Sequence, residues 1–348
     1  LSFDKLGDIL TYHHNAPILF SSGLFFFLFI GFLIIYMSLR KHLLTRIIYV
    51  TLFSIYFYYK SSGLFFFLLL FVATSDFCIA QCMTKTASKW GRKAWVVLSL
   101  CVDLGLLGYF KYFNFLREIM AAVAHELGYQ LGNTSLQNIT YQPLDIFLPV
   151  GISFFTFQTI SYVIDVYRGR IAPLRRWIDY VFYVSFFPQL VAGPIVRARD
   201  FIPQIRQNPI VVTREMFGTG VFLILTGLFK KAIISDYISL NFVDRIFDEP
   251  LLYSGFECLA GIYGYALQIY CDFSGYSDMA IGIALLLGFR FPKNFDAPYK
   301  SATITEFWRR WHISLSTWLR DYLYISLGGN RKGKLRTYGN LLITMVLG

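Results

Sequence analysis

Long apolar runs separated by short basic loops restrict the fold of this chain more than any other feature. Several runs are long enough to cross a bilayer as helices, which needs about 20 residues. Hydrophobic residues make up 56% of the 348 residues and charged residues only 15%, whereas soluble domains carry about 25% charged residues. Because a soluble core could not bury so much apolar surface, the sequence predicts an all-α membrane protein with about seven to nine spans.

The distribution of charge predicts how the spans are oriented. Apolar segments are expected at 17–37, 47–59, 63–80, 94–113, 145–166, 178–191, 217–234 and 259–289, with another starting at 341. Lys and Arg gather near 40, 85–93, 168–176, 197–214, 290–310 and 331–336. The positive-inside rule places these loops in the cytoplasm. It places the N-terminus outside, with the loops near 60, 114–144 and 236–257.

The net charge of +11 is explained by these cytoplasmic loops, so we expect no nucleic-acid partner. The segment 178–191 has basic loops on both sides and is short for a span, which favours a re-entrant segment. The five cysteines form no Cys-x-x-Cys pair. Their spacing therefore suggests neither a disulfide framework nor a zinc site, and we expect no metal.

The stretch 303–329 combines three tryptophans, several charges and one histidine. Read as one helix, it begins at Thr303, and Glu306 completes a capping box. One face of that helix would then carry Trp308, His312, Leu315, Leu319 and Tyr322. His312 is either a hydrogen-bonded core histidine or a group that abstracts a proton near neutral pH.

Polar side chains within the apolar segments are costly in a bilayer and indicate partners or a wet cavity. Asp272 and Asp278 lie in the segment 259–289, which we expect Gly275 to break. Each Asp either pairs with Lys or Arg, caps a broken helix, positions a substrate or acts in catalysis. The pair Lys230 and Lys231 indicates a broken span or a cavity lining. Cavities are expected near 188–194, which contains Gln189, and near 303–329.

Several ordered blocks resemble the membrane-bound O-acyltransferase family, and most closely its bacterial alginate O-acetyltransferase-like branch. The blocks are FLPVGISFFTFQTISYVIDVYRG, FFPQLVAGPIVRARDFIPQI, GLFKKAIISD, QIYCDFSGYSDMAIGIALLLGFRFPKNFDAPY and TEFWRRWHISLSTWLRDYLYISLGGN. They cover 145–348, whereas 1–144 matches mainly in hydropathy. The resemblance implies one membrane domain over 1–348, with N-terminal spans at 1–144 and a family core at 145–348 that is incomplete at its C-terminal end.

The resemblance also implies a fold and an activity. The expected fold is a ring of transmembrane and re-entrant helices around a central tunnel in the bacterial inner membrane. The expected activity moves an acyl group, here acetyl, from a cytoplasmic thioester to a hydroxyl of an extracytoplasmic polysaccharide or cell-wall sugar. Acetyl-CoA or an acyl-carrier thioester would be the donor substrate, with no tightly bound cofactor. An extracytoplasmic SGNH-hydrolase-like acetyltransferase would be the partner.

The family uses two histidines, and the resemblance places the first at His312. The second, the leading candidate for the catalytic base, lies in a G-x-W-H-G block that would follow Gly348. His312 would then orient the donor or acceptor, or line the tunnel. Further residues expected to bind substrate or donor, or to line the tunnel, are Trp308, Arg309, Arg310, Trp311, Ser314, Asp272, Tyr276, Asp278, Asn294, Gln189, Lys230 and Lys231.

Three other functions remain open at this point. One is D-alanyl transfer to teichoic acid from a carrier protein, on the same fold. Another is a transporter or channel, suggested by Asp272, Asp278 and the basic pair. The third is a non-catalytic subunit that passes an acyl group to a partner.

Overall fold

The computed structural model describes residue 7 and residues 10–13, 17–131 and 143–348. These residues form helices and connecting turns, with no strand among them. The helices of the first half are α2 (Gly23–Ser38), α3 (Leu43–Ser62), α4 (Phe66–Lys85), α5 (Lys89–Leu107), α6 (Phe113–Leu131) and α8 (Ile152–Tyr167). The 3₁₀ turn η1 (Gly63–Phe65) joins α3 to α4, and the π-helical turn η2 (Gly108–Tyr112) joins α5 to α6.

The second half contains more short helices. They are α9 (Trp177–Ser185), α10 (Phe187–Leu190), α11 (Ala198–Ile205), α12 (Arg214–Leu228), α13 (Asp236–Ile238), α14 (Asp244–Asp248), α15 (Gly255–Leu286), α16 (Ile304–Arg310), α17 (Ile313–Trp318) and α18 (Lys334–Leu347). The π-helical turns between them are η3 (Phe229–Ser235), η4 (Ser239–Val243) and η7 (Leu319–Tyr324), and the 3₁₀ turns are η5 (Pro250–Leu252) and η6 (Pro298–Lys300).

Three helical stretches of the described chain are long and apolar enough to cross a membrane. They run over Leu43–Lys85, Lys89–Gly128 and Arg214–Asp248, and the shorter α2 is also apolar. Many of their large hydrophobic side chains are exposed, as lipid-facing side chains are. The prediction of an all-α membrane protein is therefore confirmed.

Two segments predicted to be loops are helical over most of their length, so the prediction of loop conformation is wrong there. In the expected loop 114–144, α6 extends to Leu131; residues 132–142 lie outside the described part. In the expected loop 236–257, helix continues from α12 through η3 to the end of α14 at Asp248. Both stretches hold polar residues, but helix tolerates polar residues wherever its backbone bonds are made internally.

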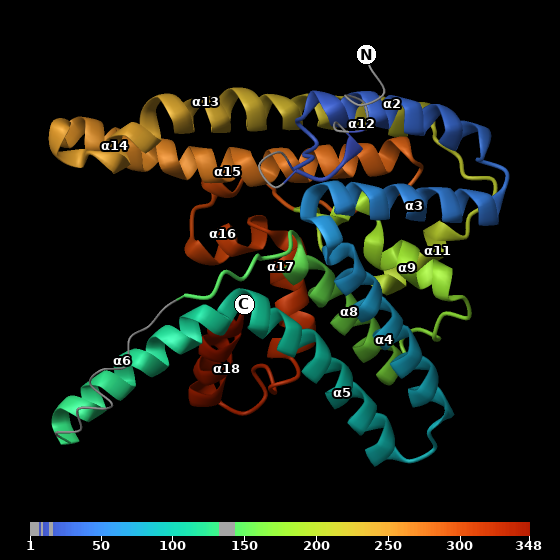
Figure 1. Ribbon diagram of the computed structural model, residues 1–348, viewed down its shortest axis with the longest axis horizontal. Coiled ribbons are helices and arrows are strands. Elements are labelled where there is room, and N and C mark those ends of the chain that lie inside the picture. Colours follow the sequence, from blue (N-terminus) through green and yellow to red (C-terminus); the bar gives the residue numbers. More distant parts are fainter. Residues whose placement is uncertain (1–6, 8–9, 14–16, 132–142) are drawn as a thin grey trace.

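Close packing of two helices explains the glycines of α12 and α15, which run side by side (Figure 1). A Cβ on Gly227 would lie 2.5 Å from the Gly275 carbonyl oxygen, and one on Gly220 would lie 2.9 Å from that of Gly282. Small residues let helix backbones approach in this way. The prediction that Gly275 breaks its helix is therefore wrong: α15 is continuous, and Gly275 is a contact point.

The segment predicted to be re-entrant is buried and irregular. It consists of α9 and the single turn α10, and its residues from Asp179 to Leu190 are buried. Phe187 contacts several aromatic rings of α2 and α3, including Phe32 and Phe53. Backbone that is not in a long helix is thus covered by protein, as membrane depth requires. This buried segment and α8 support one side of the region that holds His312.

Candidate functional site

The helix predicted over 303–329 is broken at His312. Thr303 caps α16 by accepting a hydrogen bond from the Glu306 backbone, as expected, and Glu306 accepts from the Ala302 N–H rather than from that of Thr303. The chain then turns, and His312 adopts a left-handed conformation with φ 44° before α17 begins. The expected common face of Trp308 and His312 with α17 therefore does not exist. Non-glycine residues rarely hold this conformation unless their surroundings fix it.

The segment around Asn294 fixes this turn. The Ile313 N–H donates to the Asn294 backbone oxygen at 2.9 Å, and the Asp296 N–H donates to the Arg310 oxygen at 3.0 Å. Asn294 is 1% exposed, and its Oδ1 accepts from both the backbone N–H and the Oγ of Ser314. Ser314 Oγ in turn accepts from the Ile195 N–H at 3.0 Å. Two candidate residues, Asn294 and Ser314, are thus brought next to His312.

The imidazole of His312 is surrounded by aromatic rings. Its centroid lies 4.7 Å from that of Phe273 on α15 and 6.4 Å from those of Phe154 on α8 and Phe295. Its Nε2 is buried and has no hydrogen-bond partner among the described residues. His312 lies outside the long apolar helices, and burial lowers its pKa from 6.5 to about 4. The ring is therefore neutral near pH 7, so a ring nitrogen can accept a hydrogen bond or a proton.

His312 lines a cavity of about 380 Å³. Apolar side chains such as Phe154 and Phe157 form much of its wall, and its polar lining includes Lys111, Tyr112 and Ser153. Leu347 and Gly348 also contribute. A mostly apolar hollow with few polar groups is the usual form of a small-molecule site.

A second cavity, of about 490 Å³, lies at the first turn of α17. Its lining includes Ile313 and Ser314 and is rich in charge, with Arg197, Arg199, Asp200, Arg290, Arg320 and Asp321. Arg197 and Arg320 bind Asp321 at 2.6 and 2.8 Å. Burial alone would raise the pKa of Asp321, but these hydrogen bonds hold it below its ordinary value. Arg199 pairs with Asp200 at 3.6 Å, whereas Arg290 has no carboxylate within salt-bridge distance among the described residues, so the Arg290 guanidinium is available to an anion.

The structure places the candidate tryptophans differently from each other. Trp311 packs behind the His312 turn, with ring centroids 5.1 Å from Phe295 and 5.5 Å from Phe307. Trp308 is 45% exposed. Neither lines one of the two cavities.

The charged candidates on α15 belong to a separate group. Lys230 binds Asp278 at 2.6 Å, and Lys231 binds both Asp272, at 2.6 Å, and Asp236. The span is not broken at the two lysines but passes through η3 as a π-helical turn. These ion pairs give the four charges a structural role between α15 and η3. They do not bring them to His312.

The other four candidates are also outside the two cavities. Arg310 binds Glu306 at 2.7 Å, and Arg309 is exposed. Gln189 is buried and donates to the Tyr183 oxygen, and Tyr276 stacks on Phe20 at 4.6 Å. The aromatic rings that contact the His312 ring belong instead to Phe154, Phe273 and Phe295.

Sequence reasoning missed several lining residues. Lys111 had a readable signal, because it is the one positive charge within the predicted span 94–113. Arg197 and Arg199 belong to the GPIVRARD motif, but their loop resembled an ordinary cytoplasmic anchor. Ser153 and Phe154 carry no local signal, because only the packing of α8 brings them to His312.

Comparison with known proteins identifies relatives of the chain. The model of the membrane-bound O-acyltransferase family matches residues 176–347. A probable alginate O-acetylase of Pseudomonas putida is 45% identical over 265 residues, which is 76% of this chain and 51% of that protein. The chain spans about half the length of such alginate O-acetylase relatives.

Two further relatives have other names. The peptidoglycan O-acetyltransferase of Helicobacter pylori is 36% identical over 99% of this chain and 68% of its own length. The teichoic acid D-alanyltransferase of Bacillus subtilis is 31% identical over 53% of this chain and 47% of its own length. Given the long helices, the matched family model and a relative matched along nearly the whole chain, this chain belongs to the membrane-bound O-acyltransferase family.

Proposed function

We propose that the complete protein moves an acetyl group from a cytoplasmic thioester to a hydroxyl of an extracytoplasmic polysaccharide or cell-wall sugar. The observation that carries this proposal is the neutral imidazole of His312, whose Nε2 is buried beside a cavity without a partner among the described residues. Relatives named for alginate and peptidoglycan O-acetylation support the substrate class.

The charged cavity at α17 suits the donor. Coenzyme A and the pantetheine arm of a carrier protein both carry phosphate, which arginine binds through several N–H groups. We infer that the phosphates bind near Arg199 and Arg290, while the acyl end reaches the first turn of α17. This orientation would bring the thioester close to the turn that holds His312.

The reaction requires an acceptor oxygen to lose its proton as it attacks the thioester carbonyl. The new C–O bond forms, the C–S bond breaks, and the thiol leaves with a proton. His312 would accept the hydrogen bond of the acceptor hydroxyl and so orient it. The resemblance assigns the base to a second histidine in the segment that follows Gly348 in the family.

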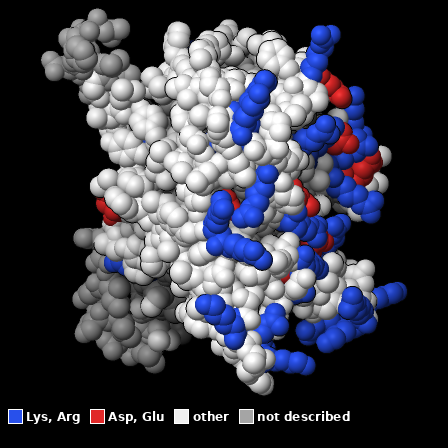
Figure 2. Space-filling view, turned by 90° about the vertical axis from the view of Figure 1, so that its right-hand side faces the viewer, with Lys and Arg blue, Asp and Glu red and all other residues white. Residues whose placement is uncertain are grey.

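We propose that the acceptor is reached through an SGNH-hydrolase-like acetyltransferase outside the inner membrane, with the N-terminus of this chain on that same side. Lys and Arg side chains gather at the end of the molecule seen in Figure 2, which is the right-hand end of Figure 1. Such an end faces the cytoplasm under the positive-inside rule.

One relative supports an alternative function. The relative named as a teichoic acid D-alanyltransferase suggests D-alanyl transfer from a carrier protein. A transporter is less well supported, because Asp272, Asp278 and the two lysines form ion pairs with each other.

The test uses the full-length protein in proteoliposomes with labelled acetyl-CoA. We expect thiol release and label transfer that fall roughly 100-fold or more in His312→Gln, the scale of a lost acid–base or orienting group. The matched control is His125→Gln, a histidine exposed on α6, which should leave the rate unchanged.

Three outcomes would reject the proposal in favour of others. Turnover of a D-alanyl carrier but not of acetyl-CoA would support the D-alanyl function. Solute flux without thioester consumption would support a transporter. Acyl transfer that depends only on the partner protein and survives His312→Gln would support a non-catalytic subunit.

A further inference from the structure

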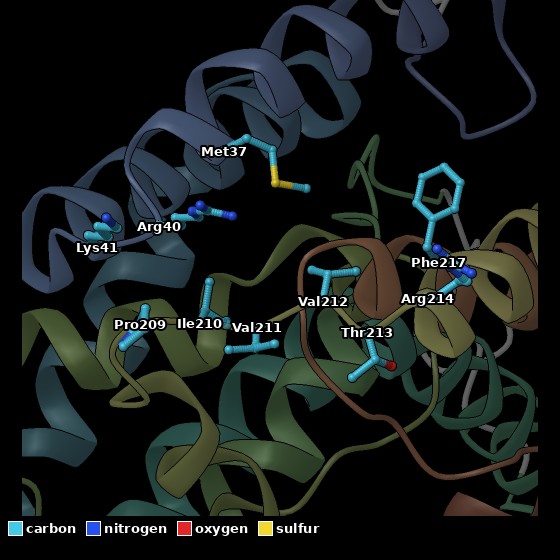
Figure 3. Close-up of a pocket in the computed structure, with 10 residues that line it drawn as sticks. All are labelled: Met37, Arg40, Lys41, Pro209, Ile210, Val211, Val212, Thr213, Arg214 and Phe217. Atoms are coloured by element: carbon cyan, nitrogen blue, oxygen red, sulfur yellow. The ribbon is translucent and has the colours of Figure 1, made fainter.

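A basic hollow lies between the end of α2 and the start of α12, outside the two cavities described above. Its volume is about 510 Å³. One wall comes from the end of α2 and the turn after it, and the other from residues 209–217 (Figure 3). The lining residues are Met37, Arg40, Lys41, Pro209, Ile210, Val211, Val212, Thr213, Arg214 and Phe217.

The hollow carries positive charge that is not neutralised within the described part of the protein. Arg40, Lys41 and Arg214 line it, and no carboxylate does. None of the three has a carboxylate within 4.0 Å in the part of the chain that the structure describes. Three unpaired cations around one hollow favour an anionic ligand.

Part of the lining is apolar, which favours an anion that also carries apolar groups. Met37, Val211 and Phe217 are 40%, 62% and 56% exposed. Further along α2, Phe27 and Ile34 also present exposed apolar side chains. A soluble phosphate would not cover these groups, whereas a ligand with a charged head and acyl chains would.

The walls are held together before any ligand binds. The Ile210 N–H donates to the Arg40 backbone oxygen at 3.3 Å, which joins the two walls directly. Arg46, which is 1% exposed, donates to the backbone oxygens of Arg40 and Ile205 at 2.9 and 3.3 Å. Because these bonds fix the backbone, a ligand would not have to organise the hollow, and preorganised sites bind more tightly.

We propose that this hollow binds the phosphate head of an anionic phospholipid of the cytoplasmic leaflet. The hollow lies among the basic loops that the positive-inside rule places at that surface. Basic pockets between membrane helices at the cytoplasmic side bind such head groups. The acyl chains would run along α2 and so tie α2 to α12. This inference rests on the proposed orientation in the membrane but not on the proposed acyl transfer.

The test measures lipid binding by the full-length protein in detergent micelles, without an activity assay. Phosphatidylglycerol should raise the thermal midpoint of the wild type more than phosphatidylcholine does, and native mass spectrometry should detect retained phosphatidylglycerol. In the triple variant Arg40→Gln/Lys41→Gln/Arg214→Gln, phosphatidylglycerol should bind roughly 100-fold more weakly, because each cation near the membrane surface contributes about fivefold to the affinity.

A matched control removes three exposed cations elsewhere. Arg331→Gln/Lys332→Gln/Lys334→Gln changes the turn before α18 and its first residue, which line none of the described cavities, and should keep wild-type lipid binding. If the first triple variant does not fold, judged by gel filtration, Arg40→Gln and Arg214→Gln are tested singly. Each should weaken binding roughly fivefold.

Several results would overturn the proposal. Equal binding of phosphatidylglycerol by wild type and Arg40/Lys41/Arg214 variants would do so, as would equal stabilisation by phosphatidylcholine. Protection by inorganic phosphate equal to that by phosphatidylglycerol would show an anion site without lipid selectivity. Phe217→Gln is the final variant and should weaken lipid binding. Unchanged binding would contradict the claim that the ligand carries acyl chains as well as a charged head.

Discussion

At the residue scale, His312 is defined by its backbone and by its burial. Its left-handed φ of 44° is held by hydrogen bonds from Ile313 and Ser314 to Asn294. Aromatic rings surround the imidazole, and its Nε2 is buried without a partner among the described residues. The same features that make this turn unusual make the imidazole available to a ligand.

His312 predicts a pH dependence of stability. Its pKa is about 4 in the folded protein and 6.5 otherwise, so between these values the unfolded state binds more protons. The neutral ring therefore leaves the free energy of unfolding unaffected above pH 6.5, and protonation of the unfolded state lowers that free energy as pH falls from 6.5 toward 4. We expect the thermal midpoint of the wild type in detergent to fall more steeply between pH 7 and 4.5 than that of His312→Gln. Parallel curves would contradict the assigned burial.

At the element scale, the contact between α12 and α15 depends on pairs of glycines spaced seven residues apart. Gly220 faces Gly282, and Gly227 faces Gly275. The ion pairs of Lys230 with Asp278 and of Lys231 with Asp272 link η3 to α15 next to this contact. Close backbone packing and paired charges thus hold the two helices together where a bilayer offers no hydrophobic drive between them.

This arrangement predicts the effect of a single methyl group. Gly227→Ala would place its Cβ 2.5 Å from the Gly275 oxygen, so the helices must separate. We expect destabilisation of about 1–3 kcal/mol, the usual cost of overpacking, seen as a lower thermal midpoint in detergent. Gly218→Ala is the control, because nothing lies within 4 Å of the added Cβ. An equal effect of the two substitutions would contradict the packing.

At the scale of the whole molecule, charge distinguishes the two ends. Basic side chains gather at the end shown in Figure 2, whereas the stretch from Asp236 to Glu257, at the opposite end in Figure 1, is rich in acid. The end with the basic loops also contains the lipid-binding hollow that we propose, lined by Arg40 and Arg214.

This asymmetry predicts the topology. With native cysteines replaced, Leu251→Cys, at a position that is 98% exposed, should react with a membrane-impermeant maleimide added outside intact spheroplasts. Ala87→Cys, at an exposed position in the turn between α4 and α5, should react only after the membrane is permeabilised. The reverse pattern would invert the proposed orientation, and it would also move the basic hollow to the outer leaflet.

The sequence alone was sufficient to predict the fold class and the family, and it singled out His312 as a candidate site residue. Apolar run length and basic loops are local signals, and the motif around His312 is contiguous. Helix ends were less predictable: α6 and α14 continue through polar residues that resemble loops. The break at His312 had no sequence signal, because no glycine or proline lies between residues 303 and 318.

Only the tertiary structure decided that this break exists and what surrounds it. The turn is stabilised by Asn294 and Ile195, which are distant in sequence, so no local periodicity could contain it. The cavity at His312 likewise arises where α5, η2, α8 and α17 meet, and the charged cavity arises where the segments 195–200 and 290–292 meet α17 and η7. The sequence by itself determined the membrane class and the chemistry that the chain carries, because hydropathy and residue type are local. The geometry of the site depended on contacts between residues far apart in the chain.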